Sequence, residues 1–106
     1  MADFMGMMKQ AAQLQSKMQA MQAELDTITV EGTAGGGMVT VTLTAKGDLK
    51  SVKFDDSLMK PSEKEIIEDL LVAAHAEARR KAEAVMAEKM KAVTGGMQLP
   101  PGLGLG

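Results

Sequence analysis

The architecture of this chain is set by residues 27–54, which read TITVEGTAGGGMVTVTLTAKGDLKSVKF. Along three short runs of this segment, apolar or small residues alternate with polar ones, a pattern typical of strands that bury one face. The alternating positions are Ile28, Val30 and Gly32, then Val39, Val41 and Leu43, then Leu49, Val52 and Phe54. Glycines at residues 35–37 and 47 separate the runs and favour turns, because glycine reaches positive φ without a steric penalty. We predict a three-stranded antiparallel meander.

A helical pattern precedes the strands, from about residue 3 to residue 26. Its apolar positions follow a 4-3-4-3 spacing, the repeat of a helix seam that packs against another helix at a shallow angle. These positions are Met7, Ala11, Leu14, Met18, Met21 and Leu25. A helix that simply covers the sheet would carry a similar stripe, so both interpretations remain open.

A second helical pattern follows the strands, after a connecting loop at residues 55–61 in which Asp55 is expected to act as a turn or capping residue. Ser62 is predicted to cap this helix, with Glu65 three residues later in the capping-box position. The helix should end near Val93, because two glycines follow. A narrow stripe of alanines through its middle would let another element approach closely.

These elements predict an α+β subunit of order α-β-β-β-α, with one domain at residues 1–94. One small sheet between two long helices cannot easily close a core within one chain, so we predict a second copy as the partner. We assign the dimer interface to the apolar strand residues Val30, Val39, Val41, Leu43, Val52 and Phe54. Residues 95–106, GGMQLPPGLGLG, carry no charge and are predicted to form a disordered tail.

The composition restricts where in the cell we expect the protein and which side-chain chemistry it can use. The chain has no cysteine, which excludes disulfides, thiol catalysis and cysteine-based zinc sites. Its N-terminus lacks the pattern of a signal peptide, and no apolar run approaches the ~20 residues of a membrane helix. We therefore expect a soluble, cytoplasmic protein.

Candidate catalytic and metal-binding residues have simpler explanations. His75 is the only histidine, and a lone helical histidine is far more often a surface residue than a catalyst. The triple glycine lacks the Gly-Lys-Ser/Thr ending of a phosphate-binding loop and joins two strands rather than a strand and a helix. We predict no enzyme activity, no metal, no cofactor and no small-molecule substrate.

Charge is unevenly distributed, although the net charge is only −2. The second helix is acidic at its start, whereas residues 79–91 contain five basic and two acidic residues. Complementing the helix dipole explains this polarity, and a positive docking surface explains it equally well. The sequence has no aromatic platform for stacking single-stranded bases. The candidate phosphate contacts are Lys9, Lys17, Arg79, Arg80, Lys81, Lys89 and Lys91.

Taken in order, three segments resemble the YbaB/EbfC family of bacterial nucleoid-associated proteins. They are MMKQAAQLQSKMQAMQAEL, VEGTAGGGMVTVTLTAKGDLKSVKFDDSLM and EIIEDLLVAAHAEARRKAE, followed by the final GGMQLPPGLGLG. The resemblance implies a homodimer in which the two sheets join and the long helices project like tweezers. It also implies binding to double-stranded DNA in the nucleoid, with a role in nucleoid organisation or gene regulation.

A second hypothesis is a protein-interaction adaptor that captures partner proteins with its methionine- and glutamine-rich first helix. Methionine surfaces suit adaptable binding, and the acidic balance of the chain agrees with this alternative.

Overall fold

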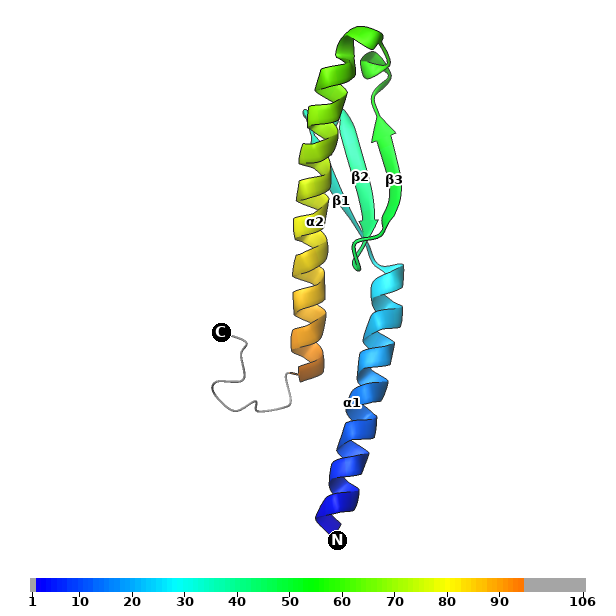
Figure 1. Cartoon of the computed structure of the whole chain (residues 1–106), viewed down its shortest axis with the longest axis vertical. Coiled ribbons are helices and arrows are strands. Elements are labelled where there is room, and N and C mark those ends of the chain that lie inside the picture. Colours follow the sequence, from blue (N-terminus) through cyan, green and yellow to red (C-terminus); the bar gives the residue numbers. More distant parts are fainter. Residues whose placement is uncertain (1, 95–106) are drawn as a thin grey trace.

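The computed structural model describes residues 2–94 and has the element order α-β-β-β-α (Figure 1). Helix α1 (Ala2–Thr27) leads into strands β1 (Thr29–Ala34), β2 (Val39–Thr44) and β3 (Leu49–Phe54). Two short 3-10 turns, Asp56–Leu58 and Pro61–Glu63, then lead into helix α2 (Lys64–Thr94). The predicted α+β subunit is confirmed. The predicted tail at residues 95–106 lies outside the described residues.

The three strands form an antiparallel sheet of order β1-β2-β3, as the alternation predicts. The triple glycine forms the β1–β2 turn, and its three residues have φ values of 65°, 67° and 93°. Gly47, in the β2–β3 turn, has a φ of 99°. The β2–β3 ladder passes from Thr42–Ser51 to Leu43–Leu49, so Lys50 is the extra residue of a bulge.

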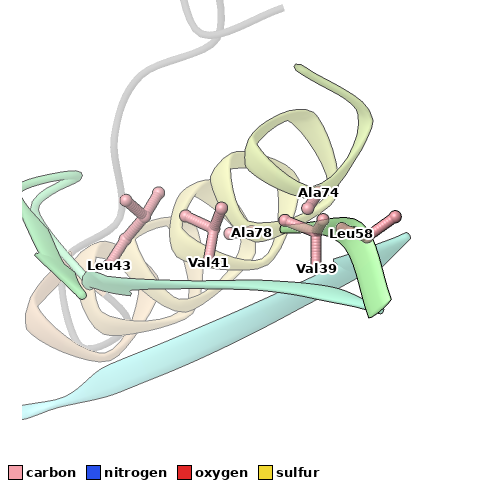
Figure 2. Packing of buried hydrophobic residues seen from close by; sticks show 6 residues of the cluster. All are labelled: Val39, Val41, Leu43, Leu58, Ala74 and Ala78. Carbon is pink, nitrogen blue, oxygen red and sulfur yellow. The ribbon is translucent and has the colours of Figure 1, made fainter. Parts of the chain in front are cut away.

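Helix α2 covers one face of the sheet and closes the main core (Figure 2). Val39, Val41 and Leu43 point from β2 toward Ala74 and Ala78 of α2, and all five side chains have no exposed surface. The small alanine side chains let the helix axis lie close to the strands, as their stripe indicates. Leu58, from the first 3-10 turn, completes the cluster.

The contact between β1 and α2 is close enough to require glycine at position 32. A Cβ atom added there would lie 2.1 Å from the carbonyl oxygen of Ala74 and 2.3 Å from the amide nitrogen of Ala78. Both neighbours are backbone atoms of α2, so no rotation of a side chain can relieve the overlap. The alternation places Gly32 on the buried face, but only the structure shows why that position lacks a side chain.

Burial within one chain changes the role of the residues assigned to a dimer interface. Val39, Val41 and Leu43 are fully buried by α2, so they cannot contact a second copy while this core is intact. Helix α2 occupies the position that the prediction gave to a partner, because its alanine stripe fits closely against β1 and β2. Val30, Val52 and Phe54 pack against the same core but are only half-buried.

The seam of α1 is divided into two halves. Its C-terminal half packs beside α2: Met21 and Leu25 are buried, with Val85 and Val93 of α2 packed against them. The helix–helix interpretation is therefore confirmed for this half. The N-terminal half of α1 extends past the end of α2 (Figure 1). Met7 and Ala11 are exposed there, and the molecule measures 72 × 27 × 16 Å along its principal axes.

The predicted cap of the second helix is wrong. The helical path begins two residues earlier than predicted, at Pro61 in the 3-10 turn Pro61–Glu63, so Ser62 lies inside the turn. Lys60 is the N-cap residue and makes no side-chain capping hydrogen bond. Proline at the first helical position explains the early start, because its fixed φ suits a helix and its missing N–H would have no partner there.

Asp55 has the capping role expected of it. Its carboxylate accepts hydrogen bonds from the hydroxyl and the backbone N–H of Ser57 at the start of the 3-10 turn Asp56–Leu58. These two hydrogen bonds, the hydroxyl first, lower the pKa of Asp55. Neither helix of the described part of the chain is apolar enough over a sufficient length to cross a membrane.

Candidate nucleic-acid interface

The structure divides the seven candidate phosphate contacts into two groups. Three of them form ion pairs within the chain. The Nε of Arg79 lies 3.4 Å from a Glu83 carboxylate oxygen, and Lys89 of α2 pairs with Glu24 of α1. Lys81 pairs with Glu77 at 3.1 Å. These cations are already partly neutralised by a neighbouring carboxylate.

The other four candidates have no ion pair with any residue between 2 and 94. They are Lys9 and Lys17 of α1, and Arg80 and Lys91 of α2. All four are exposed. Arg80 and Lys91 are eleven residues apart, about three helical turns, so they lie on nearly the same side of α2, about 16 Å apart. That side faces away from the buried alanines 74, 78 and 82.

One groove brings candidates from both helices together. It lies between α1 and α2, has a volume of about 280 Å³, and is lined by Lys17, Ala20, Met21, Glu24, Lys89, Ala92 and Val93. Because Glu24 neutralises Lys89, Lys17 is the lining cation without an ion pair inside the described chain. The groove therefore offers one available positive charge at its rim rather than a charged pocket.

Lys81 has a structural role that the sequence did not reveal. Its Nζ donates a 2.8 Å hydrogen bond to the backbone carbonyl of Glu31, on the outer edge of β1. Two residues along the same edge, the N–H of Thr33 donates to Oε1 of Glu77. We call these two side chains, Glu77 and Lys81, the β1 clamp. The only signal in the sequence was their i, i+4 spacing, which indicates an ion pair but not its target.

The β1 clamp also affects the ionisation of Glu77. The hydrogen bond from Lys81 lowers the pKa of this carboxyl most, and the N–H of Thr33 lowers it further. Both donors favour the charged carboxylate. At neutral pH the clamp is therefore an ionic contact that joins α2 to the edge of the sheet.

The open face of the sheet has few groups that could stack on bases. Its side chains are those of Thr29, Glu31, Thr33, Thr40, Thr42, Ser51 and Lys53. Phe54 packs toward the core instead, and Phe4 lies on α1. Among the described residues, no three histidine, aspartate or glutamate side chains are grouped to hold a metal ion. The candidate surface therefore consists of the cations on the two helices.

Comparison with known proteins identifies relatives along the whole chain. The sequence model of the YbaB/EbfC DNA-binding family matches residues 1–97. A nucleoid-associated protein of Bradyrhizobium sp. (strain ORS 278) is 69% identical over 106 residues, which are all of both chains. Proteins of the same name from Rhodopseudomonas palustris (strain BisB5) and Afipia carboxidovorans are 69% and 68% identical, again over the full length of both chains.

A solved structure supports the fold alone. The crystal structure of the uncharacterized protein HP0035 from Helicobacter pylori superimposes with a TM-score of 0.67 at 21% sequence identity. The match covers 86% of this chain and 91% of that one.

Proposed function

The chain belongs to the YbaB/EbfC DNA-binding family, and we propose that it binds double-stranded DNA as a homodimer, mainly through the phosphate backbone. We further propose that it acts in the nucleoid, in DNA organisation or gene regulation, as the name shared by its relatives suggests. The role is one of binding rather than of catalysis.

One observation supports binding through the phosphate backbone of DNA. Four exposed cations on the two helices have no carboxylate partner among the described residues. Lysine and arginine side chains that contact phosphates give affinity with little sequence information. A dimer would present eight such cations. If all eight neutralised phosphates, the logarithm of the binding constant would fall with the logarithm of salt concentration with a slope of about −7.

The test replaces the four unpaired cations together with glutamine, as Lys9→Gln, Lys17→Gln, Arg80→Gln and Lys91→Gln. Binding to a random duplex is measured by fluorescence anisotropy between 50 and 200 mM salt. We expect weaker binding and a salt slope smaller by about one for each lost contact, while gel filtration shows an unchanged assembly state.

A matched variant controls for the change in net charge. It replaces four exposed lysines with glutamine: Lys50 and Lys53 of the sheet, Lys60 of the following loop and Lys64, the first residue of α2. This variant should keep most of the salt slope of the parent protein. Equal losses in the two variants would show that net charge alone matters and would remove the four helix residues from the interface.

The adaptor hypothesis has one observation in its favour. The first turns of α1 expose Phe4 at 64%, Met5 at 74% and Met8 at 59% of their surfaces. Exposed apolar groups of this kind can bind protein surfaces. Absence of duplex binding by the parent protein at 50 mM salt would reject the DNA proposal and favour the adaptor.

A further inference from the structure

The apolar seam of α1 continues past the point where α2 ends. The two helices run antiparallel, and Val93, in the last turn of α2, packs against the cluster that contains Met21 of α1 (Figure 1). Met21 is 6% exposed there, whereas Met7 and Phe4, farther along the seam, are 67% and 64% exposed. We call the uncovered part the outer seam; its residues are Phe4, Met7, Ala11 and Leu14.

The chain leaves α2 beside the outer seam. Helix α2 ends at Thr94, and its last turn points toward the N-terminal end of α1 (Figure 1). The twelve residues that follow, 95–106, can span up to about 40 Å when extended. From Phe4 to Leu14 the outer seam measures about 15 Å along the helix axis. The tail is therefore long enough to follow the whole outer seam, even if Gly95 and Gly96 are used for a turn.

The tail has the composition of a segment that covers an apolar surface. Every second residue from 97 to 105 is apolar, and in an extended backbone alternate side chains lie on the same side. Two adjacent prolines, Pro100 and Pro101, favour extended backbone at the centre of the tail. No charged side chain would have to be buried. The alternating apolar residues are Met97, Leu99, Pro101, Leu103 and Leu105.

From these observations we propose that residues 97–105 dock on the outer seam of α1 in the same chain. Taken alone, such a segment is expected to be disordered, because it has no surface on which to bury its apolar side chains. The outer seam provides that surface. The tail of the same chain is favoured over any other occupant, because it begins beside the seam and is held there at high effective concentration.

Docking is independent of both the DNA proposal and the two cores. Lys9 lies two residues from Met7, and therefore on nearly the opposite side of α1, so a docked tail leaves this cation exposed. The tail can also detach while the rest of the chain stays folded. Met7→Ala should therefore change the position of the tail rather than the thermal unfolding of the chain.

The test places a nitroxide label on Gly102→Cys in the full-length, ¹⁵N-labelled chain without DNA, where this is the only cysteine. The label weakens the NMR signals of amides that lie near it. If the tail is docked, the amides of residues 4–11 should lose most of their intensity. If the tail is undocked, the strongest loss should lie around Thr94 and Met18, close to where the tail begins. That second pattern would overturn the proposal, as would a loss centred on the sheet.

Two matched variants, both with the label at residue 102, test the apolar face of the tail. Leu99→Ser combined with Leu103→Ser removes two side chains of that face and should restore the signals of residues 4–11. Gln98→Ser combined with Gly104→Ser changes the other face and should leave the signals weak. An equal response of the two variants would show that the alternating apolar residues do not hold the tail, and would contradict the proposal.

A mixed sample distinguishes the chain's own tail from that of a second copy. It combines spin-labelled protein without ¹⁵N and ¹⁵N-labelled protein without the spin label, so only contacts between molecules weaken the signals. The proposal predicts full intensity for residues 4–11 in this sample. A loss as large as in the first experiment would assign the docked tail to another molecule and would overturn docking within the chain.

Discussion

The two long helices differ in how they contribute to the molecule. Helix α2 buries a stripe of alanines against the sheet, and its side chains also reach the edge of β1. Helix α1 packs only through its C-terminal half, and the N-terminal half exposes its methionines to solvent. Regular apolar spacing thus predicts which residues share a face. Whether that face is buried depends on what lies beside it.

The largest expected difference in stability comes from replacing two glycines, one packed against α2 and one within α1. Gly32→Ala places a Cβ 2.1 Å from the backbone of α2, and we expect a loss of more than about 3 kcal/mol of stability. Gly6→Ala lies in α1, where an added Cβ meets no atom within 4 Å. It should stabilise the chain by up to about 1 kcal/mol through helix propensity. Urea unfolding followed by circular dichroism measures both; a tolerated Gly32→Ala would contradict the close packing of α2.

A second test compares the two halves of α1. Leu25→Ala removes a side chain that is 1% exposed, and we expect a loss of about 2–4 kcal/mol. Met7→Ala removes a side chain on the same seam that is 67% exposed, and its effect should stay within about 0.5 kcal/mol. Thermal unfolding of both variants measures the difference. Equal losses of stability would show that the N-terminal half of the seam is also packed in solution. That result would contradict the difference between the two halves of α1.

The smallest expected effect concerns the contact between α2 and β1. Because the folded chain lowers the pKa of Glu77, the stability from this carboxylate is present above its ordinary value of 4.5. It is lost as the pH falls through the lower, folded value. The difference in Tm between the parent protein and Glu77→Gln should therefore be small at pH 7, and it should disappear only when the pH falls below the folded pKa of Glu77, which lies under 4.5.

Glu83→Gln provides the control for this titration. Glu83 also forms an i, i+4 ion pair, with Arg79, but among the described residues neither of these two side chains makes a hydrogen bond to the sheet, as Glu77 and Lys81 do. An equal Tm difference in the control would indicate that the ion pairs alone, and not the contact with β1, produce the effect.

The strands and helices could be predicted because their signals are local. Alternation along residues 28–54 and glycines at the turns determine the sheet, and the predicted helix boundaries lie close to those observed. Ser62 was misplaced because Pro61 offers a competing local signal at the same helix start.

The arrangement of the candidate site depends on residues that are far apart in the sequence. Lys89 pairs with a glutamate 65 positions away, and Lys81 donates to a carbonyl 50 positions away. No periodicity encodes such distances. The sequence therefore identifies the basic residues, and only the fold separates those with ion-pair partners from those without. The burial of Val39, Val41 and Leu43 by α2, rather than by a partner, is a second property of this kind.

The β1 clamp has a consequence for the exposed edge of the sheet. Strand β1 is one of the two edge strands of the sheet, whose order is β1-β2-β3. Glu77 and Lys81 already use backbone groups of that strand. A strand of another molecule could pair with β1 only by displacing both side chains, so the two residues that attach a helix to the sheet also protect this edge against aggregation.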